Sequence, residues 1–349
     1  MNLVHIVPTL PPPEEGVGTY ALALARALAR GHGISSGFVV GNPDWPGRGE
    51  AEGFPVSRLP ARSAAELVSS LTRAGTATVL VHYVNYGYQR RGCPYWLVDG
   101  LTRWRRERPR HRLVTVFHEV YATGLPWQSS FWLQPVQRRL ARALLRRSHG
   151  AVTSLDLYVE RLGGETAMGG IAVSPVFSTV GEPRTVPPLA DRAPRLVVFG
   201  GRGVRLRTWT GRLAELEAAC RALGIEEICD VGPAVDSPAT VAGVPVLRYG
   251  IRSVPEVSEL LGGSRAGFLA YPPDFLAKST IFAAYCAHGL VPVCAWTPPL
   301  PARETALERL FWRPGTSETP ENIARAARTW YEGHSLNRQT ETFRRLVSP

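Results

Sequence analysis

The chain has 349 residues, 44% of them hydrophobic and 20% charged, and a formal net charge of +11. This length exceeds what one hydrophobic core usually supports, so two domains are expected, and the composition excludes a disordered chain. No apolar run reaches the ~18 residues of a membrane-spanning helix. The N-terminal segment has no basic leader, and Pro8 ends its apolar stretch early, which predicts a first strand and not a signal peptide.

The first half alternates strands and helices, which is typical of a parallel sheet covered on both faces. The predicted strands are 3–7, 36–41, 78–83, 113–117 and 150–153. The predicted helices are 20–30, 64–74, 97–107 and 133–147, with Ser63 as the cap of the second.

The segment 181–194 is rich in proline and poor in apolar residues, which predicts a linker. The alternation then restarts, with strands at 195–199, 227–231, 244–249, 266–270 and 291–295 and helices at 210–223, 254–261, 278–288, 320–331 and 337–346. We therefore predict an α/β protein with Rossmann-like domains at 1–180 and 195–330. Residues 331–349 are expected to pack back on the first domain.

The five cysteines show no metal-type spacing, so we expect reduced core thiols in a cytoplasmic protein and no metal site. Arginines concentrate at 103–108 and 138–147, and no nucleic-acid motif accompanies them. This favours peripheral contact with the inner face of an anionic membrane. The alternative is a solvated surface of an arginine-rich chain.

The first strand is followed by a glycine-containing turn, Gly16-Val17-Gly18, at the start of a helix. Free amides there could meet an anion at the positive end of the helix. The spacing differs from the dinucleotide fingerprint, which argues against a nicotinamide or flavin oxidoreductase.

His118 and Glu119 come directly after the strand 113–117, where ligands of parallel sheets bind. A histidine there can donate to a sugar hydroxyl or to a developing charge. A structural histidine is the alternative.

Cationic residues follow two strands of the second half. Gly200-Gly201-Arg202 ends a strand, and Arg205 and Arg207 come next, well placed for a diphosphate. Lys278 is the one lysine among 40 basic residues, and it precedes Ser279 and Thr280 at a helix start. A point charge, a cap and free amides would converge on a phosphate. Chance placement of a surface lysine is the alternative.

Aromatic and acidic residues near the strand ends of the first half are acceptor candidates. Aromatic faces suit sugar rings or an apolar aglycone, and core packing is the alternative for several of them. The predicted acceptor-binding residues are Glu15, Tyr83, Glu119, Tyr121 and Trp127.

Together these residues resemble the GT-B superfamily, and within it the retaining enzymes of glycosyltransferase family four. The stretches that carry the resemblance are 16–21, 117–119, 201–207, 231–233 with 249–251, and 283–293. It implies two domains facing across a cleft that binds a nucleotide-sugar. The implied donor-binding residues are Gly16, Gly18, Gly201, Arg207, Gly232, Tyr249, Ile251, Ser279 and Thr280.

The chain departs from the family pattern in the second domain. The family usually has two glutamates there, and alignment on Gly289 puts Leu276 and Ala284 at their positions. The donor is then held differently, by Lys278, or donor binding has been lost.

The resemblance implies metal-independent transfer of a sugar from a UDP- or GDP-type nucleotide-sugar to a hydroxyl of a small-molecule, lipid-linked or polysaccharide acceptor. The catalytic candidates are His118, Arg202 and Lys278, and no cofactor is expected. The alternative is a degenerate, non-catalytic partner subunit. The sequence leaves the sugar, base, acceptor and oligomeric state open.

Overall fold

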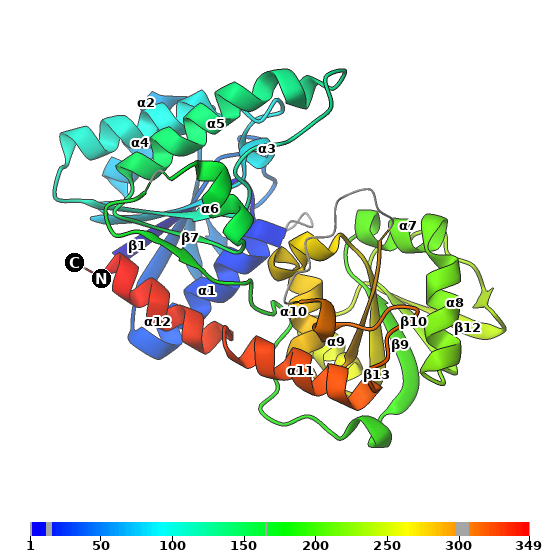
Figure 1. Ribbon diagram of the computed structural model, residues 1–349. Coiled ribbons are helices and arrows are strands. Elements are labelled where there is room, and N and C mark those ends of the chain that lie inside the picture. Colours follow the sequence, from blue (N-terminus) through cyan, green and yellow to red (C-terminus); the bar gives the residue numbers. More distant parts are fainter. Residues whose placement is uncertain (1, 12–15, 165, 297–306, 349) are drawn as a thin grey trace. The chain divides into compact units, whose positions relative to one another are not determined.

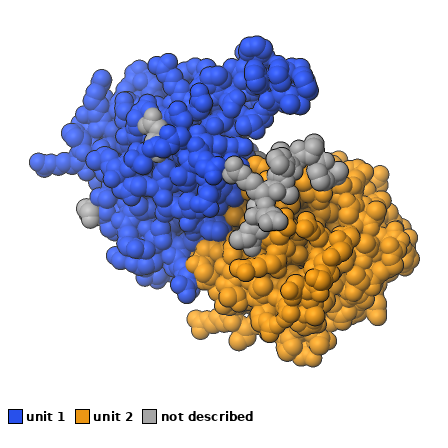
Figure 2. Space-filling model, viewed as in Figure 1, with its two compact units in different colours: residues 1–175, 336–349 blue, residues 176–335 orange. Residues whose placement is uncertain are grey.

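A computed structural model describes residues 2–11, 16–164, 166–296 and 307–348. The chain divides into two compact units, unit 1 (residues 1–175 and 336–349) and unit 2 (residues 176–335), which are coloured separately in Figure 2. The sequence predicts domain boundaries at 180 and 330.

Unit 1 is built on a sheet of eight strands among the described residues, in the order β3-β4-β2-β1-β5-β6-β7-β8. All neighbours pair in parallel except β3 and β4, which form an antiparallel hairpin. The strands are β1 Asn2–Val7, β2 Ser35–Val40, β3 Glu50–Ala51, β4 Phe54–Arg58, β5 Thr78–Tyr83, β6 Arg112–Phe117, β7 Gly150–Thr153 and β8 Ile171–Val173.

Helices cover both faces of this sheet, as the predicted alternation requires. Figure 1 shows α2, α4 and α5 over one face and α1 and α12 over the other. The helices are α1 Gly16–His32, α2 Ala64–Arg73, α3 Asn85–Tyr88, α4 Tyr95–Glu107, α5 Ser129–Arg147, α6 Asp156–Leu162 and α12 Leu336–Val347. Ser63 caps α2 by accepting the N–H of Glu66.

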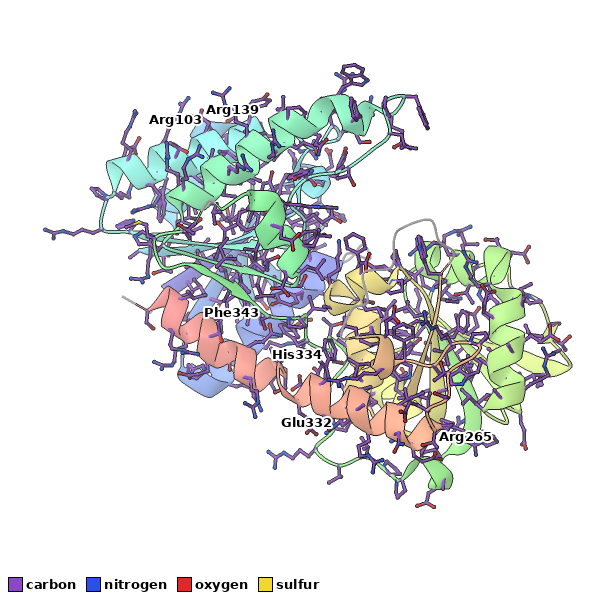
Figure 3. All side chains as sticks on the ribbon, in the orientation of Figure 1. Arg103, Arg139, Arg265, Glu332, His334 and Phe343 are labelled. Carbon is purple, nitrogen blue, oxygen red and sulfur yellow. The ribbon has the colours of Figure 1, made fainter. Side chains whose placement is uncertain are left out.

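The last helix, α12, belongs to unit 1 although it is far along the chain. Tyr20 of α1 donates a hydrogen bond to Gln339 of α12, with 3.2 Å between Oη and Oε1. Phe343 of α12 is buried, and Figure 3 shows where it lies on this helix. These contacts complete the cover of the α1 face of the sheet.

Unit 2 repeats the architecture with a sheet in the order β11-β12-β10-β9-β13-β14, counting the described strands. The strands are β9 Ala193–Phe199, β10 Glu227–Val231, β11 Thr240–Val241, β12 Val244–Gly250, β13 Ser264–Ala270 and β14 Val291–Ala295. The helices are α7 Arg202–Gly211, α8 Leu213–Ala222, α9 Val254–Gly262, α10 Thr280–Ala287 and α11 Pro320–Glu332, with 3-10 turns at Leu189–Asp191, Pro273–Lys278 and Glu308–Leu310. Its core includes Trp209, Leu216, Phe268 and Ile323.

The five cysteines are free, and Cys220, Cys229, Cys286 and Cys294 are buried while Cys93 is partly exposed. No helix in the described parts of the chain is long and apolar enough to cross a membrane.

Candidate functional site

His118 lies where the sequence placed it, directly after β6 at the carboxyl end of the unit 1 sheet. Its backbone N–H donates to the carbonyl of Tyr83 at 3.0 Å, and the N–H of Glu119 reaches the same oxygen at 3.3 Å. Both residues are half-buried. These bonds fix the start of the loop after β6, so the position of the imidazole depends on the register of β5 and β6.

Two further histidines join His118 in a hydrogen-bonded row that the sequence reading missed. His82 Nδ1 lies 3.1 Å from His118 Nε2, and His82 Nε2 lies 3.1 Å from His5 Nδ1. Ser36 Oγ lies 3.3 Å from the other ring nitrogen of His5. We call these four side chains the histidine row.

Burial keeps the inner histidines of this row neutral. His5 and His82 have no exposed surface. Desolvation lowers the pKa of His5 to about 3. Desolvation holds the pKa of His82 well below its ordinary value, and the charges that His5 and His118 would carry when protonated lower it further.

The first glycine-containing turn belongs to the same part of unit 1. Helix α1 begins at Gly16, and Gly18 is buried in its first turn. The ring of Tyr20, one turn from Gly16, meets the His118 ring edge-on with 5.0 Å between centroids. Tyr20 therefore links the start of α1 to His118. Glu15 lies outside the described residues.

The predicted acceptor residues of unit 1 differ in how far they are exposed. Tyr83 is fully buried and packs its ring on Phe117, so the prediction that it presents a face to an acceptor was wrong. Its position in β5 points it into the core. Tyr121 is half-buried, and its hydroxyl donates to the Arg161 carbonyl. Trp127 is 78% exposed.

In unit 2 the turn after β9 leads straight into a helix. The sequence predicts Arg202, Arg205 and Arg207 ahead of a helix that begins at 210, whereas the structure begins α7 at Arg202, with Gly201 as its N-cap residue. The first turn of α7 holds no acidic residue. Basic side chains at the positive end of a helix dipole are unfavourable unless an anion accompanies them. This arrangement therefore favours an anion site.

The middle arginine of α7 has a structural partner. Arg205 and Asp230 are both buried, and Nε of Arg205 lies 2.7 Å from Oδ1 of Asp230. Arg205 also donates to the Pro233 carbonyl. Asp230 lies in β10, so the pair joins the start of α7 to the turn after β10. Arg202 and Arg207 instead contact backbone carbonyls of Ala234 and Ala270, each at 3.4 Å.

Two glycines let the turns after β9 and β10 touch. Gly232 has φ 142°, and a Cβ there would lie 2.3 Å from the Gly200 carbonyl oxygen. Gly200 has φ 128°, and a Cβ there would lie 2.4 Å from Cδ1 of Ile281 in α10. The start of α10 therefore meets the turn that opens α7. Side chains larger than hydrogen would separate these segments.

Lys278 immediately precedes Ser279, the N-cap residue of α10. It ends the 3-10 turn Pro273–Lys278, and its ammonium lies 5.8 Å from the centre of the Phe275 ring. Ser279, one of the two residues that the sequence offers as a cap, caps α10, because its Oγ accepts the N–H of Phe282 at 3.2 Å. Thr280 is the first residue of the helix. The amides of this turn and the lysine share one end of the unit 2 sheet with α7.

The two positions that lack the family's glutamates are in the core. Leu276 and Ala284 have no exposed surface. An ionised carboxylate at such a site would be costly without a partner. The absence of both carboxylates is therefore consistent with how this chain packs around α10.

The residues predicted to contact the nucleotide base differ in whether their backbone or their side chain is available for that contact. The Gly232 N–H donates to the Gly250 carbonyl at 2.9 Å, which joins the turns after β10 and β12. Tyr249 turns its side chain back along the sheet, where its hydroxyl lies 3.4 Å from Glu227. A contact of Tyr249 with a base would therefore come from its backbone. Ile251 is 74% exposed.

No group of three or more histidine, cysteine, aspartate or glutamate side chains within the described ranges could hold a metal ion.

Solved structures resemble the chain over nearly its whole length. A sucrose-phosphate synthase from Thermosynechococcus elongatus matches 99% of this chain and 98% of its own, at 12% identity and a TM-score of 0.59. An alpha-glucosyltransferase in complex with UDP-glucose and DNA matches 99% and 94%, at 12% identity and 0.54. The chain has the GT-B fold.

The same fold also serves another reaction. A UDP-GlcNAc 2-epimerase from Neisseria meningitidis, bound to UDP-GlcNAc, matches 98% of each chain at 12% identity and a TM-score of 0.51. No protein-family model and no curated protein matches the sequence. The comparisons therefore establish the GT-B fold of the chain, and the activity has to be argued from the site.

Proposed function

We propose that the protein is a retaining, metal-independent glycosyltransferase of the family-four type, which moves a sugar from a UDP- or GDP-sugar to a hydroxyl acceptor. The observation that carries this proposal is in unit 2. Helix α7 begins with Arg202 and has no acidic residue in its first turn. The turn that precedes it contacts the start of α10, which Ser279 caps and which follows Lys278, the one lysine of the chain. Two helix N-termini with Arg202, Arg207 and Lys278 form a site for a diphosphate.

Such a site suits the chemistry of glycosyl transfer. Breaking the glycosyl–phosphate bond leaves negative charge on the diphosphate and positive charge on the sugar ring. Fixed cations and amides aimed at the leaving group stabilise this transition state more than the ground state. We assign Arg202, Arg207 and Lys278 to the leaving diphosphate, with the Ser279–Thr280 amides beside them.

The remaining roles belong to residues at strand ends. We assign Gly16, Gly18, Gly201, Gly232 and the backbone of 249–251 to the donor, and Glu119, Tyr121 and Trp127 to the acceptor. His118 contacts an oxygen of the transferred sugar. The leaving phosphate accepts the proton of the attacking acceptor hydroxyl, so a pair of catalytic carboxylates at glycosidase spacing is not needed.

Replacing Lys278 by alanine should weaken binding of the cognate nucleotide-sugar by about tenfold to a hundredfold, the range for losing a hydrogen bond to a charged group. Isothermal titration calorimetry against UDP- and GDP-sugars measures the effect. Arg221→Ala, which removes an exposed arginine of α8, is the matched control and should bind as the parent does.

The same titration separates the proposal from its alternative, a non-catalytic partner subunit. A transferase should bind one nucleotide-sugar and hydrolyse it slowly when acceptor is absent, with Lys278→Ala impaired in both. If no UDP- or GDP-sugar binds and none is consumed with a panel of sugar, lipid and DNA acceptors, the transferase proposal fails. If binding is present but turnover is absent, the partner-subunit reading replaces it.

We also propose that unit 1 contacts anionic membrane through one end of α5. Leu125, Trp127, Phe131 and Trp132 are exposed, and Trp132 Nε1 donates to Pro126, which ties this apolar tip together. Figure 1 shows this end of α5 standing out from unit 1. Helices α4 and α5 of the same unit carry exposed arginines, among them Arg103 and Arg139 (Figure 3). Aromatic residues combined with cationic charge fit an anionic lipid surface.

The double variant Trp127→Ser/Trp132→Ser should bind phosphatidylserine-containing vesicles at least about tenfold more weakly, because both rings lose their apolar contact with lipid. Co-sedimentation with such vesicles measures the affinity. Met168→Ser, which removes another exposed apolar residue of unit 1, is the control. Equal binding of the parent to neutral vesicles, or unchanged binding of the double variant, would contradict the proposal.

A further inference from the structure

Four polar side chains cross the unit 1 sheet in strand order, one from each of β2, β1 and β5 and one from the end of β6. These are the members of the histidine row, Ser36, His5, His82 and His118. Ser36, His5 and His82 are buried, and Tyr20 of α1 lies edge-on to His82 and His118. The row therefore runs beneath α1, from a buried hydroxyl to the half-buried His118.

We propose that Ser36, His5 and His82 are positioning residues that fix His118 as the neutral tautomer protonated on Nδ1. The role of His118 at the sugar rests on the proposed function, but its tautomer does not. The family resemblance predicted His118 alone, whereas the row follows from the three contacts of 3.1 to 3.3 Å that join its members.

The row can point in only one of two directions. A neutral imidazole has one N–H donor and one acceptor nitrogen, so the direction of one link sets the direction of the next. If the Ser36 hydroxyl donates to His5 Nε2, then His5 Nδ1–H donates to His82, and His82 Nδ1–H donates to His118 Nε2. If His118 donates instead, every link reverses.

Ser36 selects between these directions. Its hydroxyl is 2% exposed and makes its hydrogen bond with His5 and with no other atom of the described residues. In the reversed row His5 would donate to Ser36, and the Ser36 proton would be left buried without an acceptor. An unsatisfied buried donor is costly, so the direction that starts at Ser36 is preferred.

The direction of the row decides what His118 can do. Its Nε2 accepts from His82, so the neutral ring carries its proton on Nδ1. With its proton on Nδ1 and Nε2 engaged by His82, the ring has no nitrogen left to accept a proton, so it serves as a donor and not as a general base.

Long-range ¹H–¹⁵N correlation spectra of ¹⁵N-histidine-labelled protein, recorded without nucleotide-sugar, test the proposal. In the parent, His118 should show a protonated Nδ1 and an unprotonated Nε2, assigned by loss of the signals in His118→Asn. In Ser36→Ala the hydroxyl that favours one direction of the row is absent, so both directions become about equally stable. The fraction of His118 protonated on Nε2 should then rise from below a tenth to about half. Ser36→Thr keeps a hydroxyl and should restore the parent spectrum.

Ser35→Ala is the matched control, because Ser35 precedes Ser36 in β2 and is exposed. It should leave the spectrum unchanged. A parent His118 protonated on Nε2, or a folded Ser36→Ala with the parent tautomer, overturns the proposal. Because no donor is present, these results are independent of whether the protein binds a nucleotide-sugar: a failed titration with an intact row would overturn the function and not the tautomer.

Discussion

Removing the carboxylate of Asp230 should destabilise unit 2 more than any exposed substitution. Asp230→Ala leaves the Arg205 guanidinium buried without its 2.7 Å partner. An uncompensated buried charge of this kind costs about 3–5 kcal/mol. Urea unfolding followed by tryptophan fluorescence measures the loss, and Trp209 in the unit 2 core reports on it. Since each unit has its own sheet, unit 2 should unfold in an earlier, separate transition.

The control for this prediction is an ion pair of the same type at the surface. Arg221 and Glu217 of α8 are 65% and 40% exposed, and Glu217→Ala should cost less than about 1 kcal/mol. The double variant Arg205→Met/Asp230→Leu should recover most of the loss, because it removes both buried charges together. If Asp230→Ala unfolds at the same urea concentration as Glu217→Ala, the pair does not hold the α7 and β10 turns together.

The sequence predicted the sheets better than it predicted this region. The strand at 78–83 was placed with its observed bounds, because a run of buried residues in a parallel strand is continuous and easily recognised. The start of α7 was missed. Its sequence holds several arginines and threonines, no acidic residue in the first turn and no capping side chain, so no local helix signal was present. Tertiary contacts of Arg205 and Trp209 define it instead.

The histidine row was missed for a different reason. His5, His82 and His118 each fell in or beside a predicted strand, but they are far apart in sequence. They meet because β1 pairs with β5 and β5 with β6: His5 pairs with Leu80, and His82 pairs with Val116. Each next histidine is therefore two residues beyond the paired position and projects from the same face of the sheet. A sequence read one segment at a time gives the strands without their order. The same limit let Tyr83 be assigned to an acceptor although its side chain enters the core.

Buried histidines should make the protein lose stability steeply as the pH falls below 6.5. Desolvation lowers the pKa of His5 to about 3. It is also the largest cause that lowers the pKa of His82 well below its usual value. In unit 2, burial lowers the pKa of His288 to about 4 and that of His334, which follows the end of α11 (Figure 3), to about 4. Each ring is therefore neutral in the folded protein over a range where it is protonated in the unfolded chain.

Between pH 6.5 and about 4 the unfolded state binds more protons, so stability rises with pH in this range and is complete above about pH 7. At pH 5.5 each buried histidine should already cost about 1.4 kcal/mol relative to neutral pH. Urea midpoints measured between pH 5 and 7.5 give the slope, above the range where most carboxylates titrate.

A single substitution tests the origin of that slope. His288 is held by Ser258 Oγ at 2.8 Å and by the Ala284 carbonyl at 2.8 Å, both suited to its neutral form. His288→Gln lowers stability at every pH but removes one titrating group, so the slope for unit 2 should fall by about 1.4 kcal/mol per pH unit. Glu217→Ala should shift the midpoints without changing the slope. A parent whose stability is flat from pH 7.5 to 5, or a His288→Gln variant with the parent slope, would show that these rings bind protons while the protein remains folded.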